Sequence, residues 1–296
     1  MKKLGFCLLV TVLVQASFAR ADENLLGYVK GAETLPKGSW ELYQILTSRD
    51  NKGAGKYHAL DSKTEVEYGA TDSLSLSGSL QMLQVEMSGL SVDGYLPKDN
   101  NLSLRPSGVE AGLKYNFLSP AKDIIGLSSY LSFSYNWLDR HSGQNKDSYS
   151  MELLFIAQKY FLEGEVVWSS NLGFETTYAR RGDLNDLPPG FDWPVEPEVE
   201  IGFTADTGVA YRFMPNWFIG AEALFESEYE TEVGTERWTV FTGPSLHYGS
   251  EKWWATLTWI QQVSGGGEKF DAQDDNNLHL IEKTKYETRL KVGFNF

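Results

Sequence analysis

Histidine is the side chain most often used as a catalytic base near neutral pH, and this chain has four: His58, His141, His247 and His279. Nucleophilic catalysis needs a base within hydrogen-bond reach of a serine, and a third group that orients the base. His141 is followed directly by Ser142, but adjacency in sequence does not create that geometry. No two histidines have the spacing of metal ligands. We therefore expect no enzymatic activity, no metal site and no cofactor.

Two clusters near the C-terminus are candidates for ion sites, and only the acidic one has suitable ligands. The glycine run at 265–267 lacks the pattern of a phosphate-binding loop and predicts a flexible extracellular connection. Asp271, Asp274 and Asp275 could coordinate calcium, or bridge to lipopolysaccharide through a divalent ion, because hard cations take carboxylate oxygens. They lack the spaced-ligand pattern of a dedicated site, so a solvated loop is the favoured interpretation.

Charged side chains recur at every second position of many segments, on the face opposite to the apolar residues. Burying so many unpaired charges in a dry core would cost several kcal/mol per ion. They must therefore face water or form paired networks, as in the lumen of a barrel. The predicted lumen-facing charges are Asp61, Lys63, Glu65, Glu67, Glu110, Lys114, Glu152, Glu175, Asp206, Arg212, Glu222, Glu226, Lys283, Lys285, Glu287, Arg289 and Lys291.

The elements that carry these charges are predicted to be β-strands, because polarity alternates with a period of two. In 107–117, for example, Val109, Ala111 and Leu113 share one face, and Glu110 and Lys114 lie on the other. A helical period of 3.6 residues does not fit this pattern. Twelve such segments are expected, at 38–48, 57–69, 72–84, 101–117, 125–138, 147–160, 164–179, 197–213, 216–229, 236–249, 252–263 and 278–296.

The connections between these segments are alternately short and long. The short ones fall at 70–71, 162–163, 214–215 and 250–251, with a moderately longer one at 118–124. The long ones lie near 49–56, 85–100, 139–146, 180–196, 230–235 and 264–277. Aromatic residues gather near both kinds of connection, as two membrane interfaces would select. An even number of strands with this loop asymmetry predicts an all-β fold, a single antiparallel transmembrane barrel with both termini in the periplasm.

The N-terminal region predicts export. Lys2 and Lys3 precede an apolar run at 4–14, and Ala19-Arg20-Ala21 fits a cleavage site, so 1–21 is predicted to be a signal peptide. The only cysteine lies inside it. Residues 22–37 would then be a polar periplasmic segment, which could enter the lumen or form a disordered tail, and 38–296 would be the barrel. The Pro-rich loop at 180–196 could cap the pore, bind a surface ligand, or lie exposed with local packing only.

Composition excludes several classes of protein. The chain has 296 residues and a net charge of -14, which argues against nucleic acid as a partner. It is 42% hydrophobic and 14% aromatic, which is too apolar for a disordered chain. Its mean hydropathy of -0.33 argues against a bundle of membrane helices, but a membrane barrel, apolar only at every second residue, remains compatible.

The C-terminus resembles the β-signal of Gram-negative outer-membrane proteins, with Leu290, Val292, Phe294 and the terminal Phe296 at alternate positions. The opening at 35–41 is similar to the start of a functionally uncharacterised family of exported barrels. The resemblance implies a location in the outer membrane, surrounded by lipid and lipopolysaccharide. It also implies transient contact with the barrel-assembly machinery, which reads the last strand.

For function, the sequence favours a porin-like channel or transporter for small solutes. An acidic wall would favour cations, and the basic last strand would create a transverse field. Two alternatives remain open. One is a non-conducting structural or surface-binding barrel in which the charges form salt bridges. The other, less favoured, is an outer-membrane enzyme.

Overall fold

The computed structural model describes residues 24–91, 100–183, 195–230, 234–270, 273, 275 and 277–296. The predicted signal peptide at 1–21, Asp271, Asp274 and most of the loop at 180–196 lie outside these residues.

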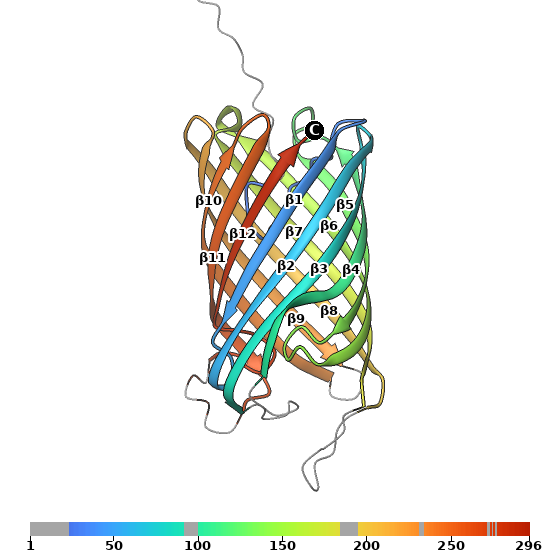
Figure 1. The fold of residues 1–296 in the computed structure, drawn as a ribbon. Helices are drawn as coiled ribbons and strands as arrows, with labels where there is room; N and C mark the ends of the chain where they lie inside the picture. Colours follow the sequence, from blue (N-terminus) through green and yellow to red (C-terminus); the bar gives the residue numbers. More distant parts are fainter. Residues whose placement is uncertain are drawn as a thin grey trace, which may run out of the picture.

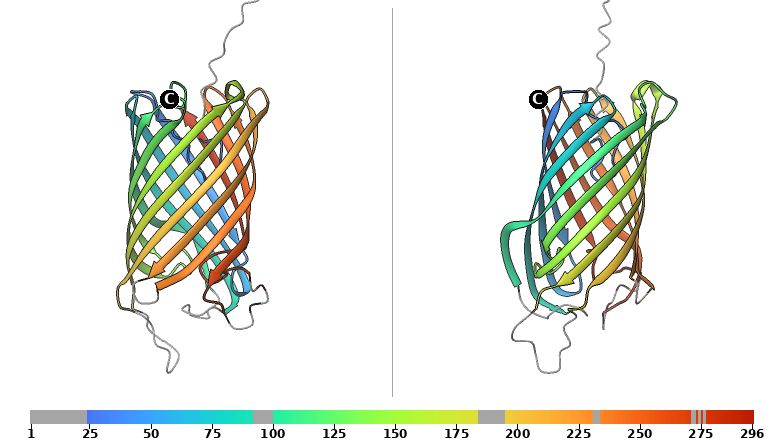
Figure 2. Two further views of the ribbon diagram at one scale, coloured as in Figure 1. Left: turned by 180° about the vertical axis from the view of Figure 1, so that it is seen from behind. Right: turned by 90° about the vertical axis from the view of Figure 1, so that its right-hand side faces the viewer.

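Twelve antiparallel strands close into one barrel, in which each strand pairs with its neighbours in sequence and β1 pairs with β12 (Figures 1 and 2). This confirms the predicted fold class and strand number. One 3-10 turn, Leu162–Gly164, joins β6 to β7. The strands are β1 Trp40–Asp50, β2 Ala54–Thr71, β3 Leu74–Ser91, β4 Asn100–Leu118, β5 Gly126–Leu138, β6 Asn145–Phe161, β7 Val166–Arg181, β8 Glu198–Met214, β9 Trp217–Glu230, β10 Gly234–Gly249, β11 Trp253–Gly267 and β12 Tyr286–Asn295.

The first and last strands pair along a seam that closes the barrel, and this pairing continues to the C-terminal residue. Ten residue pairs run from Glu41↔Asn295 to Asp50↔Tyr286. Beyond them, the main chains of Trp40 and Phe296 exchange hydrogen bonds of 3.2 and 2.9 Å. Closure leaves no sheet edge unpaired, which is what a strand-built structure requires in lipid, where water cannot satisfy the main chain.

The outer surface of the barrel is apolar and the inner surface is polar. Along β3 and β4, Leu76, Leu80, Val109 and Leu113 are each about two-fifths exposed on the outside. Aromatic contacts gather at both ends of the strands: Trp217–Tyr248–Trp253 lies near the short turns, and Tyr135–Tyr149 near the longer loops. Among the described residues, no helix is long and apolar enough to cross a bilayer.

The two ends of the barrel differ, as Figure 1 shows. The end with the short turns, here called the short-turn end, also carries the C-terminus; the opposite one is the long-loop end. One connection predicted to be longer, near 49–56, is tight, because β1 ends at Asp50 and β2 begins at Ala54. Asn51 and Gly53 turn the chain there with φ of 63° and 58°.

The predicted last strand at 278–296 is wrong in its first part, because β12 begins only at Tyr286. Leu278 and Leu280, expected on the outer face, are 4% and 8% exposed inside the barrel mouth. Lys283 and Lys285 consequently belong to the preceding loop. The glycine run at 265–267 is likewise not a loop, since it forms the end of β11.

Candidate functional site in the barrel lumen

Residues 24–37, here called the plug, enter the short-turn end of the barrel with 24–32 inside it, and then leave past the short turns to begin β1 (Figure 2). Leu25, Leu26 and Val29 are at most 5% exposed and pack against Val167 and Ala210 of the inner wall. The structure thus decides between the two possibilities left open for this segment, in favour of the lumen.

A single carboxylate of the wall holds the first turn of the plug. Glu222 of β9 accepts hydrogen bonds from the main-chain N–H groups of Gly27, Tyr28 and Val29, at 2.8, 2.8 and 2.9 Å. Its Oε1 atom also accepts a bond of 3.0 Å from the hydroxyl of Thr258. Glu222 is 1% exposed, so its charge is compensated by these donors rather than by water.

Neutral side chains hold the rest of the plug by its main chain. The amide of Asn171 accepts from Lys30 N at 2.7 Å and donates to Lys30 O at 3.0 Å. Gln158 accepts from Ala32 N at 2.6 Å. Asn116 donates to Ala32 O at 2.7 Å, and the hydroxyl of Ser128 donates to the same oxygen.

The basic last strand contacts the opposite side of the plug. The guanidinium of Arg289 lies 3.6 Å from the ring centroid of Tyr28 and donates to Gly27 O at 3.3 Å. The hydroxyl of Tyr28 donates to Glu287 at 2.9 Å, and Lys291 donates to the side chain of Asn24 at 2.5 Å. Three predicted lumen charges of β12 therefore bind the plug.

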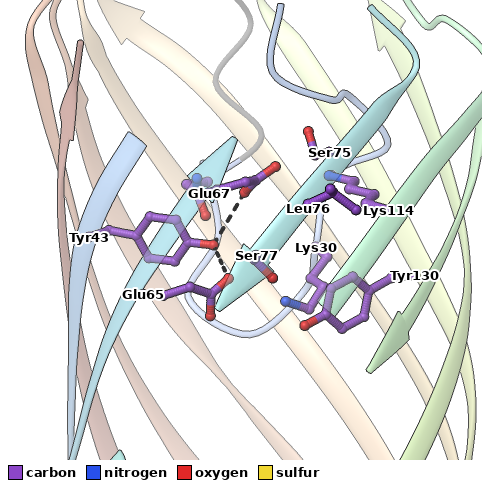
Figure 3. A pocket seen from close by; sticks show the side chains of 11 residues that line it. Lys30, Tyr43, Glu65, Glu67, Ser75, Leu76, Ser77, Lys114 and Tyr130 are labelled. Atoms are coloured by element: carbon purple, nitrogen blue, oxygen red, sulfur yellow. Dashed lines mark hydrogen bonds between the residues drawn. The ribbon is translucent and has the colours of Figure 1, made fainter. Parts of the chain in front are cut away.

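Beside the plug lies a small pocket of about 30 Å³, drawn in Figure 3. Tyr43 donates from its hydroxyl to Glu65 at 2.5 Å and lies 3.4 Å from Glu67. Lys30 of the plug lies over the ring of Tyr130, 4.5 Å from its centroid. Lys114, another predicted lumen charge, also lines this pocket.

A larger cavity of about 730 Å³ occupies the lumen beyond the plug; it is called the central cavity below. Thirteen Asp or Glu and nine Lys or Arg residues line it, so its lining is acidic on balance. Most of these charges are paired. Lys63 bridges Glu65 and Glu110 at 2.7 Å each, and Lys283 reaches Glu226 at 2.5 Å. Such a charged, roomy space is suited to water and polar solutes rather than to apolar ligands.

One part of the cavity wall is acidic without a matching cation. Glu152 of β6 and Glu175 of β7 are directly opposite each other in the strand register. Within the part of the chain that the structure describes, neither carboxylate has a Lys, Arg or His at ion-pair distance, and the same holds for Asp206 of β8. On the other side of Glu175, its partner in the strand register is Gly202 of β8, which has no side chain to add to this wall.

The long-loop end is narrowed by residues 277–285, here called the cap. Leu278, Leu280 and Ile281 pack in one buried cluster with Leu83 and Leu138. Gln262 of β11 fixes the cap by its main chain: its amide donates to His279 O at 2.9 Å and Thr284 O at 3.1 Å, and accepts from His279 N at 2.6 Å. This anchoring explains why 278–285 leave the strand ladder.

The loop between β5 and β6 also folds inward at the long-loop end. Asp139 accepts bonds from the N–H groups of His141 and Ser142, at 2.9 and 2.6 Å. Burial alone would raise the pKa of Asp139, but Lys146 and the bonds from Ser142 lower it on balance. Arg140 reaches Asp61 at 3.2 Å, and Arg49 holds the same carboxylate at 2.7 Å.

The buried position of Lys52 is expected to make the stability of this end of the barrel depend on pH. It is 2% exposed in the turn next to the cap, and burial lowers its pKa to about 7 from the usual 10.5. A lysine with a depressed pKa destabilises the folded state increasingly as pH falls between those values, because the unfolded chain binds the proton first. We expect a smaller free energy of unfolding at pH 7 than at pH 9.5, and Lys52→Met should reduce the difference.

Urea titrations of the protein in detergent micelles at the two pH values would measure this effect. Lys56→Met, at an exposed lysine of β2, is the matched control. The attribution to Lys52 is wrong if both variants keep the pH dependence of the unsubstituted protein.

The other predicted lumen residues have varied surroundings. Lys285 leaves the wall and pairs with Asp275 at 3.2 Å. Arg212 lies near the short-turn end of β8, where its main chain bonds to Glu165. The interpretation from the sequence missed Asn171, Gln158 and Ser128, because it collected only charged residues. Their polar character at inward-facing strand positions was the available signal.

Three of the histidines have different side-chain partners. His247 contacts Thr256 at 2.7 Å, His279 contacts Glu282 at 2.5 Å, and His58 contacts Asp50 at 2.8 Å. In the described ranges, no group of three His, Cys, Asp or Glu side chains is arranged to hold a metal ion.

Solved structures share this architecture at low sequence identity. An outer membrane channel from Pseudomonas putida F1 is similar at a TM-score of 0.55 with 15% identity, over 90% of this chain and 98% of the other. The β domain of the Bordetella autotransporter Brka matches at 0.55 with 9% identity, over 88% and 100%. The translocator domain of the autotransporter NalP from Neisseria meningitidis matches at 0.52 with 14% identity, over 90% and 91%.

These similarities, with the apolar outer band, establish the fold as that of a Gram-negative outer-membrane β-barrel. No curated protein is significantly similar in sequence. One family model matches residues 18–296, nearly the whole chain. The chain therefore belongs to the family of unknown function DUF6662.

Proposed function

We propose that the protein is a channel through which small polar solutes, preferentially cations, cross the outer membrane, and that the plug closes it in this conformation. The observation that carries the proposal is the central cavity of about 730 Å³, whose lining has more carboxylates than cations. A barrel that served only as a structural scaffold would not need a charged cavity of this volume along its axis. A barrel of the same fold from Pseudomonas putida is described as an outer membrane channel.

The acidic pair Glu152 and Glu175 supports the cation preference. Two carboxylates opposite each other across neighbouring strands repel, so their side of the cavity has a negative potential that attracts cations. Arg289 and Lys283 line the same cavity, and their position supports the transverse field expected from the basic C-terminal segment. We infer a transport role rather than a catalytic one, because the chemistry offered here is electrostatic.

The conductance of the protein in a planar bilayer under a salt gradient tests this proposal. We expect discrete steps and a cation-biased reversal potential. The double variant Glu152→Gln/Glu175→Gln should reduce the cation-to-anion permeability ratio about two- to fivefold, because it removes the two charges without changing the size of the side chains.

Glu163→Gln, in the exposed turn between β6 and β7, is the matched control and should leave the ratio unchanged. A ratio that is equal in all three proteins would contradict the role given to the acidic pair.

A permanently closed barrel is the second candidate function. It is favoured by the plug at the short-turn end and the cap at the long-loop end, which together narrow both entrances. Such a barrel would act through its surface. Folded protein that never conducts, even after the plug has been loosened by substitution, would favour this candidate over the channel.

A further inference from the structure

The wall around the plug recognises groups that every peptide carries. At least ten hydrogen bonds join wall side chains to the main chain of residues 24–32. Bonds to polar side chains of the same segment include those of Tyr28 with Glu287 and of Asn24 with Lys291. Leu25, Leu26 and Val29 pack against apolar wall residues, as in a plug that only fills space. The polar side chains of the wall, by contrast, bind mainly N–H and C=O groups of the main chain.

The recognition groups are built into the barrel. Glu222, Gln158, Asn171 and Ser128 are each at most 2% exposed, and they come from four different strands. Three successive N–H groups converging on one carboxylate form a compact anion-binding turn, which depends on main-chain geometry and hardly on side-chain identity. The side-chain amide of Asn171 likewise binds only main-chain groups of Lys30, its N–H and its C=O.

Side chains add two restrictions. At Gly27, an added Cβ would lie 2.4 Å from the hydroxyl oxygen of Thr258, so only glycine fits there without a shift. At Lys30, the ammonium lies over Tyr130 beside a pocket that Glu65 and Glu67 also line, which favours a basic residue.

The plug borders the central cavity. Gly27, Tyr28 and Lys30 form part of the cavity lining, so a solute in the cavity lies next to the plug. When the plug withdraws, its wall groups face the lumen and need new hydrogen-bond partners, either from water or from a ligand of matching pattern.

We propose that this wall is a binding site for short peptides, specifically peptides with a glycine followed three residues later by a basic residue, and that the plug occupies it as an internal ligand. The inference rests on the proposed channel function and names its class of solute. The plug and a peptide would then compete for the same wall. Peptide binding would displace the plug and so open the channel to the peptide.

Binding can be measured independently of conductance. A full-length variant, Gly27→Ala/Val29→Pro, loosens the plug, because it adds a methyl group against Thr258 and removes the N–H group that Val29 donates to Glu222. The wall is unchanged. Val29→Pro alone is the second variant, should the double variant not fold by circular dichroism. Fluorescence anisotropy in detergent micelles then reports the binding of labelled peptides.

Three peptides separate the explanations. The first has the sequence of residues 24–34. The second keeps its two glycines and lysine in place and shuffles the remaining residues. The third is the first peptide with N-methyl groups on the amides that correspond to Gly27, Tyr28 and Val29. We expect the first two to bind within tenfold of each other and the third to bind at least tenfold more weakly. Adding Glu222→Gln to the loosened variant should weaken the first two by a similar factor.

Binding of the first peptide alone would overturn the inference, because the wall would then recognise only its own plug. Absence of binding by all three would overturn it as well. If the protein binds peptide but never conducts, the peptide site is supported and the channel function is contradicted. If it conducts but binds no peptide, the channel function is supported and the peptide site is contradicted.

Discussion

Loosening the plug is expected to raise the open probability of the channel at least tenfold. Glu222 accepts three main-chain hydrogen bonds from the plug, and a bond to a charged group contributes about 1.5–3 kcal/mol. Glu222→Gln replaces one acceptor oxygen with a donor that opposes these N–H groups, so most of that contribution should be lost. A change of about 1.4 kcal/mol shifts an equilibrium tenfold. Single-channel recordings of the variant and of the unsubstituted protein would measure the effect.

Thr34→Ala is the control. The hydroxyl of Thr34 donates an exposed hydrogen bond of 2.9 Å to Asp72 O near the short turns, and it has no hydrogen bond to Glu222 among those described. The variant should behave like the unsubstituted protein. If Glu222→Gln leaves the open probability unchanged while the unsubstituted barrel conducts, then the plug is not the gate, and the cap becomes the structure to test.

Replacing Phe296 with serine is expected to lower the amount of assembled barrel in the outer membrane several-fold, with little effect on the stability of refolded protein. The side chain is 77% exposed, so its packing contributes little, and its main chain pairs with Trp40 whatever the side chain is. The resemblance of the last strand to a β-signal implies that the assembly machinery reads this residue. Outer-membrane levels in cells and urea titrations in vitro measure the two quantities separately.

Phe117→Ser makes the same chemical change at a 58% exposed position of β4, also at the short-turn end. It should leave assembly in cells nearly normal. Equal losses in both variants would show a general need for interfacial aromatics, and normal levels for Phe296→Ser would contradict the reading of the terminal strand.

The strand pattern was predictable because it is local. Alternation such as Val109, Glu110, Ala111 places residues on opposite faces of any strand, whatever the strand packs against. The last segment shows the limit of this argument. Leu278 and Leu280 continue the alternation of β12, but the amide of Gln262 binds the main chain of the cap and folds it into the mouth. A pattern of period two cannot reveal that competing contact.

The sequence by itself determined that this protein is a twelve-stranded outer-membrane barrel with charges on the face opposite to its apolar residues, because periodicity and loop length depend on near neighbours in the chain. Only the tertiary structure decided that residues 24–32 enter the lumen, and that Glu222 binds Gly27, which lies 195 positions away in the sequence. Which wall residues meet the plug depends on the diameter of the barrel and the stagger of its strands, and these are properties of the closed sheet as a whole.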